Sequence, residues 1–260
     1  MERNKYLKER KEVTVIPRRD YYWKYLQEPI SISDVIMLTG NDCTESTFKP
    51  YNSNTFKVRL SIFLPDKEEI TKIIFEKNFE KVKTNFLWFS STRALHKELD
   101  LCLDVFSNNN LYLHACGNIK DEEAFFELYK KELTELNNIT YYGFVDINSS
   151  IYKNIIKKCA FSIFPSCSEG GGGSLLTCMA HGLIPIATKE TSVTIKQNYG
   201  ILLNDYKIEY ISEIVNQASS LSNDKLKNMA LESLEFTFKN HNIETYKQDL
   251  INALKTINVL

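Results

Sequence analysis

From residue 85 to residue 204, short apolar runs alternate with amphipathic segments, and this pattern constrains the fold more than any other feature of the chain. The apolar runs occupy residues 85–91, 111–117, 139–145, 160–166, 183–188 and 200–204. Their lengths fit buried strands, and most of the segments between them have helical spacing. Repeated strand–helix alternation predicts an α/β fold, a parallel sheet with helices on both faces. Ligands in such sheets bind outside the carboxyl ends of the strands, so the residues after each strand are candidates for a site.

The other segments are assigned from the same periodicities. We expect strands at 34–40 and 57–65 and a weakly helical connector at 67–84. Helices are predicted at 97–107, 121–136, 148–159 and 174–182, and over 207–258 in two or three pieces. Residues 1–33 have no strong period, so no element is predicted there.

Composition and charge exclude several partners and locations. The net charge is −1 at pH 7, so no overall basic field attracts nucleic acid. None of the six cysteines forms a C-x-x-C pair or a zinc-ligand cluster, which predicts buried thiols in a reducing compartment. The first residues are charged and no apolar run reaches about 18 residues, so we expect a cytoplasmic protein. Peripheral attachment to the inner face of a membrane stays open.

The most informative segment is FPSCSEGGGGSLLTCMAHGLIPIA, residues 164–187. It leaves a predicted strand, passes Glu169 and a glycine run, and enters an apolar helix near Ser174. The run consists of Gly170, Gly171, Gly172 and Gly173. Glycines let a backbone approach a ligand closely, and a helix N-terminus offers free N–H groups that suit a phosphate. A carboxylate beside such a turn can accept hydrogen bonds from hydroxyls, so the segment fits a sugar diphosphate.

The same segment resembles the signature of family-4 glycosyltransferases, retaining enzymes of the two-domain GT-B fold. The matching positions are Pro165, Ser166, Glu169, Gly170, Met179, Ala180, Gly182 and Pro185. The resemblance covers residues 84–205 and implies a Rossmann-like donor domain at 84–235. It also implies a partial N-terminal α/β segment at 1–66, a connector at 67–83, and a C-terminal helix at 236–260 that packs back toward the N-terminal part.

The resemblance assigns roles to individual residues. The family's first glutamate contacts the donor sugar, which transfers to Glu169. The second, which holds the ribose hydroxyls, is replaced by Thr177. Threonine has one hydroxyl and no charge, so nucleotide affinity is expected to fall by roughly 1.5–3 kcal/mol unless another group compensates.

A basic loop after the first strand of the domain, residues 89–100, resembles a second family element. Lys97 falls on the family lysine that contacts the donor diphosphate, and Arg93 is the candidate for the family arginine. The glycine that follows the lysine in the family is Glu98 here, which adds a negative charge beside the expected phosphate site. His96, next to Lys97, is a further candidate for ligand contact.

Two weaker elements complete the predicted site. Phe144 and Val145 follow a strand where the family's backbone brackets the nucleobase. Gly40, Asn41 and Thr44 resemble the end of the acceptor domain that faces the cleft. A complete acceptor domain needs on the order of 150 residues, more than precede residue 84. A truncated form, half of a split enzyme with a complementary N-terminal-domain polypeptide, and a shortened relative all fit this length.

The reaction implied is transfer of a sugar, with retention, from a nucleotide-diphosphate sugar to a hydroxyl of a glycan or lipid-linked acceptor. Such chemistry fits cell-surface polysaccharide or glycoconjugate synthesis. No metal cofactor is expected, since the family does not require one and no Asp-x-Asp motif occurs. The alternatives are a non-catalytic nucleotide-sugar-binding module and a sugar epimerase of the same fold. A nicotinamide enzyme is disfavoured because the strand–G-x-G-x-x-G–helix fingerprint is absent.

Overall fold

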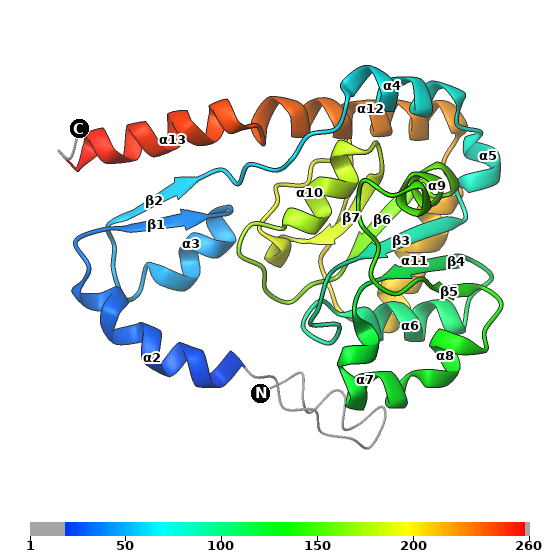
Figure 1. Cartoon of the computed structure of the whole chain (residues 1–260), viewed down its shortest axis with the longest axis horizontal. Coiled ribbons are helices and arrows are strands. Elements are labelled where there is room, and N and C mark those ends of the chain that lie inside the picture. The colour runs from blue at the N-terminus through cyan, green and yellow to red at the C-terminus, as the bar shows by residue number, and fades with distance from the viewer. Residues whose placement is uncertain (1–18, 258–260) are drawn as a thin grey trace.

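The computed structural model describes residues 19–257, with side chains from residue 25 onward. The part of the predicted N-terminal segment at residues 1–18 lies outside the described residues. The described chain forms a large α/β unit, residues 67–240, and a smaller N-terminal unit, residues 19–58 (Figure 1).

The large unit contains a six-stranded, fully parallel sheet, as the alternation predicts. Its strands are β3 (Asn85–Phe89), β4 (Tyr112–Cys116), β5 (Ile139–Tyr141), β6 (Phe161–Phe164), β7 (Ile184–Thr188) and β8 (Ile201–Leu203). The spatial order is β5-β4-β3-β6-β7-β8, so the direction of winding reverses between β3 and β6. This is the strand order of doubly wound nucleotide-binding folds. A crevice is expected at the reversal.

Helices cover both faces of this sheet (Figure 1). One face carries α6 (Leu99–Ser107), α8 (Lys130–Thr134) and α11 (Ile208–Ser219). The other carries α9 (Ser150–Lys158) and α10 (Gly173–Ala180), with α12 (Asn223–Asn240), α4 (Lys67–Glu76) and α5 (Phe79–Val82) packed beside them. Because both faces are covered, β6 and β7 are buried along their whole length.

The helix predicted at 121–136 is wrong as a single element. The chain forms η1 (Ile119–Asp121), α7 (Glu123–Leu128) and α8, with the break at Tyr129. Tyr129 leaves helical geometry, at φ −112° and ψ 22°, and its buried ring stacks on Phe125 at 5.0 Å between centroids. Burying this ring in the core explains the break, which the apolar spacing does not reveal.

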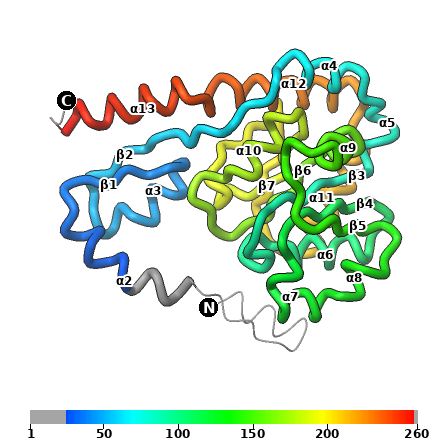
Figure 2. Tube along the Cα trace, in the orientation of Figure 1, coloured from blue at the N-terminus to red at the C-terminus, as the bar shows by residue number. Residues whose placement is uncertain are grey.

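The N-terminal unit is a two-stranded parallel sheet, β1 (Ile36–Thr39) and β2 (Thr55–Val58), with α2 (Arg19–Ile32) and α3 (Asp42–Phe48). The C-terminal helix α13 (Ile243–Thr256) runs along β2 (Figure 2). The domain boundaries predicted from the resemblance stay a prediction, and α12 runs through the one placed after residue 235.

The strand predicted at 57–65 is wrong in its extent, because β2 ends at Val58. Residues 59–66 cross from the small sheet to α4, and their backbone groups find other partners. The Arg59 N–H donates to the Asp249 carboxylate at 3.0 Å, and the Ile62 N–H donates to the His241 carbonyl at 3.1 Å. Asp249 on α13 and His241 between α12 and α13 therefore accept the hydrogen bonds that a neighbouring strand would otherwise accept. The chain crosses between the two units here and again at the α12–α13 junction.

Candidate functional site

The candidate site lies at the carboxyl ends of β3 and β6, where the strand order reverses. These two strands pair only near their beginnings, Phe86 with Phe161 and Leu87 with Ser162. Beyond that point no further pairs form, whereas β3 pairs with β4 along five residues. The loops that follow β3 and β6 contain Lys97 and Glu169, so the topology brings two separated predicted residues to one crevice.

The loop that carries Lys97 is held by buried groups. The indole N–H of Trp88 donates to the Lys97 carbonyl at 3.1 Å, and the Lys97 N–H donates to the Arg93 carbonyl at 3.0 Å. The Ala94 N–H donates to the Glu122 carboxylate at 2.9 Å. Trp88 is 1% exposed, so the backbone of Lys97 is fixed to the core while its side chain extends from it.

Lys97 and Glu169 face each other in the crevice. The Nζ of Lys97 lies 3.6 Å from Oε1 of Glu169, and the two side chains are 14% and 18% exposed. The backbone N–H of Glu169 donates to the Glu190 carbonyl at 2.9 Å. The pair places one cation and one anion within reach of a single bound molecule.

The glycine run enters α10 through a left-handed residue. Gly172 is the N-cap, at φ 62° and ψ 37°, and has no side chain to cap the helix. A Cβ at this position would lie 2.5 Å from Cγ2 of Val193 and 2.6 Å from the Thr191 carbonyl, so only glycine fits. The first N–H groups of the helix consequently have no side-chain cap and no intrahelical acceptor, which is the arrangement that binds phosphates.

The family model for glycosyl transferases group 1 matches residues 70–233, well over half of the chain. The chain belongs to this family. A search of curated protein sequences finds no match.

Solved structures of glycosyltransferases share the fold of this group 1 chain. TarM, a protein of S. aureus, is 15% identical over 90% of this chain, with a TM-score of 0.67. The Anabaena protein HepE, in complex with UDP and glucose, is 12% identical over 90% of this chain, with a TM-score of 0.66. Sucrose-phosphate synthase from Thermosynechococcus elongatus is 12% identical over 93%, with a TM-score of 0.72.

The chain spans about half the length of TarM, since the likeness covers 46% of that protein, and it covers 68% of HepE and 63% of the synthase. At these identities the likeness establishes the fold. The chain therefore has the α/β fold of GT-B glycosyltransferases, with a Rossmann-like parallel sheet.

The backbone at Glu98, which replaces the expected glycine, has a conformation that favours glycine. Glu98 has φ 57° and ψ 34°, the left-handed region that favours glycine, and its side chain is buried. A non-glycine residue in this conformation costs on the order of 1 kcal/mol. Arg93 is also left-handed, at φ 67°, and its side chain is exposed. The tight turn from β3 to α6 therefore contains two strained residues on either side of Lys97.

The other predicted residues of the turn regions lie as follows. Gly170 is exposed, Gly171 and Gly172 are buried, and Gly173 and Ser174 are half-buried. His96 is brought next to the glutamate loop, since its Nδ1 lies 3.8 Å from the Cys167 sulfur.

Thr177 does not offer its hydroxyl proton to a ligand in this structure. Its Oγ1 donates to the Gly173 carbonyl, one turn earlier in α10, at 2.8 Å. The hydroxyl proton is therefore bonded to the backbone of α10. A ribose at this position would meet only the lone pairs of the Thr177 oxygen.

The two residues predicted to bracket a base differ in how far their side chains are exposed. Phe144 is 62% exposed, whereas Val145 is 5% exposed and packs into the core. The preceding Gly143 has φ 72°, and its carbonyl accepts from the Gly117 N–H at 2.8 Å, which ties the ends of β4 and β5 together. Any contact by Val145 would come from its backbone.

A cavity of about 800 Å³ lies along β8, α11 and α12 and has no predicted site residue in its lining. Its lining includes residues 195–198, which precede β8, and Asn204, which follows it, so it extends along the whole strand. A smaller cavity of about 200 Å³ lies against Gly171, between Leu60 and Ser192.

Among residues 19–257 no three His, Cys, Asp or Glu side chains gather as a metal site, and no helix is both long and apolar enough to cross a membrane.

Sequence reasoning missed several residues that hold the site in position. Trp88 reads as an ordinary strand residue, and its indole bond to Lys97 depends on the fold of the loop. Ser192 lies outside every predicted motif, and Thr39 is not singled out within its predicted strand, yet both donate to the glutamate loop. The left-handed φ of 65° at Ser192 gives no signal in the sequence.

Proposed function

We propose that this chain supplies the nucleotide-sugar-binding half of a glycosyltransferase that moves a sugar from a nucleotide diphosphate to a hydroxyl acceptor, with retention. The single observation that supports this most is the 3.6 Å Lys97–Glu169 pair beside the uncapped N-terminus of α10. A cation and helix N–H groups suit a diphosphate, and a carboxylate suits sugar hydroxyls.

In this proposal the bond between the anomeric carbon and the diphosphate oxygen breaks while a bond to the acceptor oxygen forms. Negative charge develops on the diphosphate, and Lys97, Arg93 and the first N–H groups of α10 stabilise it. Glu169 accepts hydrogen bonds from the sugar and orients it. The proton of the acceptor hydroxyl leaves with the departing diphosphate. The nucleotide is proposed to contact Phe144, His96 and the backbone at Val145. These residues lie on loops that follow β5 and β3, at the carboxyl ends of the strands.

HepE is in complex with UDP and glucose, which motivates uridine nucleotides as the first probes. The acceptor is proposed to be a glycan or lipid-linked sugar, in cell-surface polysaccharide or glycoconjugate synthesis. The proposed location is the cytoplasm, with peripheral attachment to the membrane. No resident metal is part of this proposal, so EDTA should leave donor binding unchanged.

The test begins with calorimetry on UDP, GDP, UDP-glucose, UDP-galactose, UDP-N-acetylglucosamine and GDP-mannose, followed by transfer assays with an acceptor library. Glu169→Ala and Lys97→Ala should each lower transfer by at least about 100-fold, the scale of removing one transition-state donor. The matched controls are Glu127→Ala and Lys130→Ala, an exposed ion pair at 3.0 Å on α7 and α8. Wild-type activity in both site variants would contradict the proposal.

A second candidate is a binding module without transfer, alone or with a complementary N-terminal-domain polypeptide. It is favoured by Thr177, whose hydroxyl is committed to the Gly173 carbonyl where the family pattern has a glutamate. Donor binding with no transfer to any acceptor in the library, including water, would support this candidate. Release of a free sugar epimer would instead support an epimerase.

A further inference from the structure

We propose that the hydroxyls of Thr39, Thr44 and Ser192 are positioning groups that couple docking of the N-terminal unit to the placement of the Glu169 carboxylate. The inference rests on the proposed function, because it gives a role to the sugar-binding carboxylate. It assigns roles to Thr39 and Ser192 that neither the family pattern nor the sequence gives, and it gives a defined partner to Thr44, which the sequence predicts to face the cleft.

Two of these hydroxyls form a chain that ends on Glu169. The Ser192 hydroxyl donates to the Glu169 carbonyl at 2.6 Å. The same oxygen lies 2.5 Å from Oγ1 of Thr44, on α3 of the N-terminal unit. A serine hydroxyl carries one proton, which the carbonyl takes, so Thr44 must donate to Ser192. We call these two bonds the hydroxyl chain.

A third hydroxyl from the N-terminal unit holds the next peptide. Oγ1 of Thr39, at the end of β1, donates to the Gly170 carbonyl at 2.5 Å. The backbone oxygens of Glu169 and Gly170 therefore both depend on residues of the N-terminal unit, directly or through Ser192. The Glu169 N–H is held within the large unit by the Glu190 carbonyl, and the Glu169 carbonyl by Ser192, whose hydroxyl Thr44 in turn orients.

Two glycines allow the backbones of the two units to pack closely beside the hydroxyl chain. Gly40 has φ 137°, and a Cβ there would lie 2.3 Å from Oγ1 of Thr44 and 3.0 Å from Cβ of Ser192. A Cβ at Gly171 would lie 3.3 Å from Cδ2 of Leu60. Both glycines let the two units approach at the glutamate loop.

The geometry makes Glu169 sensitive to how the N-terminal unit docks. In the part of the chain that the structure describes, the backbone passes between the units only at residues 59–66 and at the α12–α13 junction, and few side chains of the N-terminal unit are buried. If it shifts, the Gly170 carbonyl loses its hydrogen bond from Thr39, and Ser192 loses the Thr44 donor that fixes its hydroxyl against the Glu169 carbonyl. The carboxylate, which faces Lys97, would then lose its fixed direction.

The experiment measures the contribution of the sugar separately from that of the nucleotide. Calorimetry gives the dissociation constants of UDP and of UDP-glucose, UDP-galactose and UDP-N-acetylglucosamine, and of GDP and GDP-mannose. The readout is the ratio between each nucleotide sugar and its own diphosphate. Glu169→Ala defines the ratio without the carboxylate.

Thr44→Val, Thr39→Val and Ser192→Ala each remove a hydroxyl and should shift this ratio toward that of Glu169→Ala by about 5-fold, the scale of one hydrogen bond. Affinity for the diphosphate alone should change less than about twofold, since Lys97 and the helix N-terminus are untouched. Thr44→Ser keeps the hydroxyl and should restore the wild-type ratio.

Thr47→Val is the matched control, because Thr47 lies on the same helix and bonds only its own turn, to the Cys43 carbonyl. Wild-type ratios in all three hydroxyl variants would overturn the inference while leaving the proposed function standing. Equal losses for diphosphate and nucleotide sugar would also overturn it, since they would show a merely structural role. A wild-type protein that binds none of the probes would contradict the proposed function itself.

Discussion

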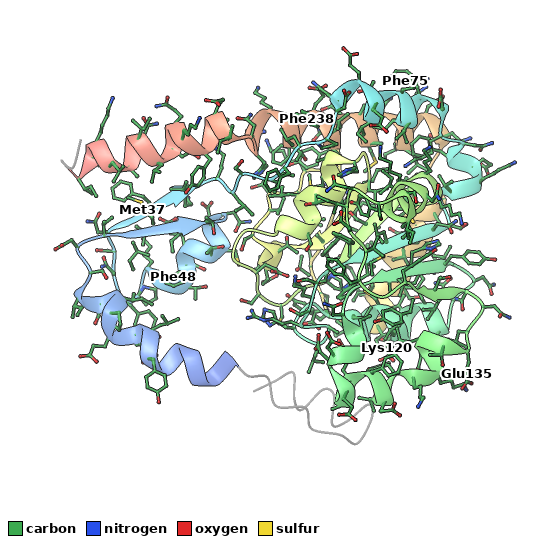
Figure 3. All side chains as sticks on the ribbon, viewed as in Figure 1. Met37, Phe48, Phe75, Lys120, Glu135 and Phe238 are labelled. Atoms are coloured by element: carbon green, nitrogen blue, oxygen red, sulfur yellow. The ribbon has the colours of Figure 1, made fainter. Side chains whose placement is uncertain are left out.

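The large unit and the N-terminal unit are held in different ways. In the large unit the sheet is buried on both faces, and Phe86 stacks on Phe161 at 4.9 Å between ring centroids. Among residues 25–58 only Ile30, Leu38 and Val58 are buried apolar residues. Figure 3 shows the same contrast, with side chains crowded in the large unit and sparse around Met37 and Phe48.

Polar contacts hold the chain after β2 against α13 and the α12–α13 junction. Arg59 forms two short hydrogen bonds to the Asp249 carboxylate, each 2.7 Å, and His241 Nδ1 donates to the Leu60 carbonyl at 2.9 Å. We therefore expect the order of the N-terminal unit to depend chiefly on its contacts with the rest of the chain. Its stability should therefore be local, whereas that of the large unit should be global.

The largest expected difference comes from one substitution made in both units. Leu113→Ala, on β4, should lower the free energy of unfolding by about 3 kcal/mol, because it leaves a cavity in a closed core. Leu38→Ala, on β1, should change the main transition by less than about 1 kcal/mol, since its unit opens before the large unit unfolds. Urea denaturation followed by circular dichroism measures both. Equal losses would show a single cooperative unit and break the comparison.

The two units are also expected to respond differently to acid, because each depends on a different buried histidine. Burial lowers the pKa of His114 from 6.5 to about 4. The neutral ring is held between Asn85 Oδ1, at 3.0 Å from Nε2, and the Tyr142 hydroxyl, at 2.9 Å from Nδ1. The folded state binds the proton more weakly than the unfolded state. Stability is therefore complete above pH 6.5 and falls as the pH drops toward 4, by about 3 kcal/mol in total.

His114→Gln should remove this part of the acid dependence from global unfolding, measured by urea titrations between pH 4 and 7. Burial also lowers the pKa of His241, at the junction with the N-terminal unit. His241→Gln should alter the acid dependence of amide exchange in residues 34–58 and leave that of global unfolding unchanged. An unaltered global profile in His114→Gln would refute the assignment.

The smallest expected effect is at the interface ion pair. Asp249→Asn keeps the shape but removes the charge that pairs with Arg59, whose side chain is 42% exposed. Solvent screening limits the loss to about 1 kcal/mol, so amide exchange in residues 34–58 should accelerate about 5-fold with no change in the main transition. Glu244→Gln, on the exposed part of the same helix, is the control and should have no effect. A shift of the main transition would argue against local docking.

The six strands of the large unit follow from alternation alone, since each lies in a short apolar run between helical segments. Their order does not follow, and order is what places the Lys97 loop beside the Glu169 loop. The family resemblance supplied that juxtaposition. The pattern also missed α3, because none of its residues is buried and its start is fixed by Asn41 accepting from the Cys43 N–H.

The hydrogen bonds that hold the site in position were beyond prediction for a different reason. The bonds of Thr39, Thr44 and Ser192 join positions separated by up to 148 residues, and they depend on backbone angles that local composition does not set. A serine in a left-handed turn looks like any other serine in the sequence. The family resemblance identified the charged candidates for the site, and the coordinates reveal the neutral residues around them.

The two crossings between the units lie next to each other, since the Ile62 N–H donates to the His241 carbonyl. The chain between Ile62 and His241 is therefore one continuous segment whose first and last residues lie next to each other. A gene segment for this stretch could move by recombination into another host protein without a new linker at either end. Exchange of the N-terminal unit would then require only two breakpoints, and the six-stranded sheet would pass intact from one host to the next.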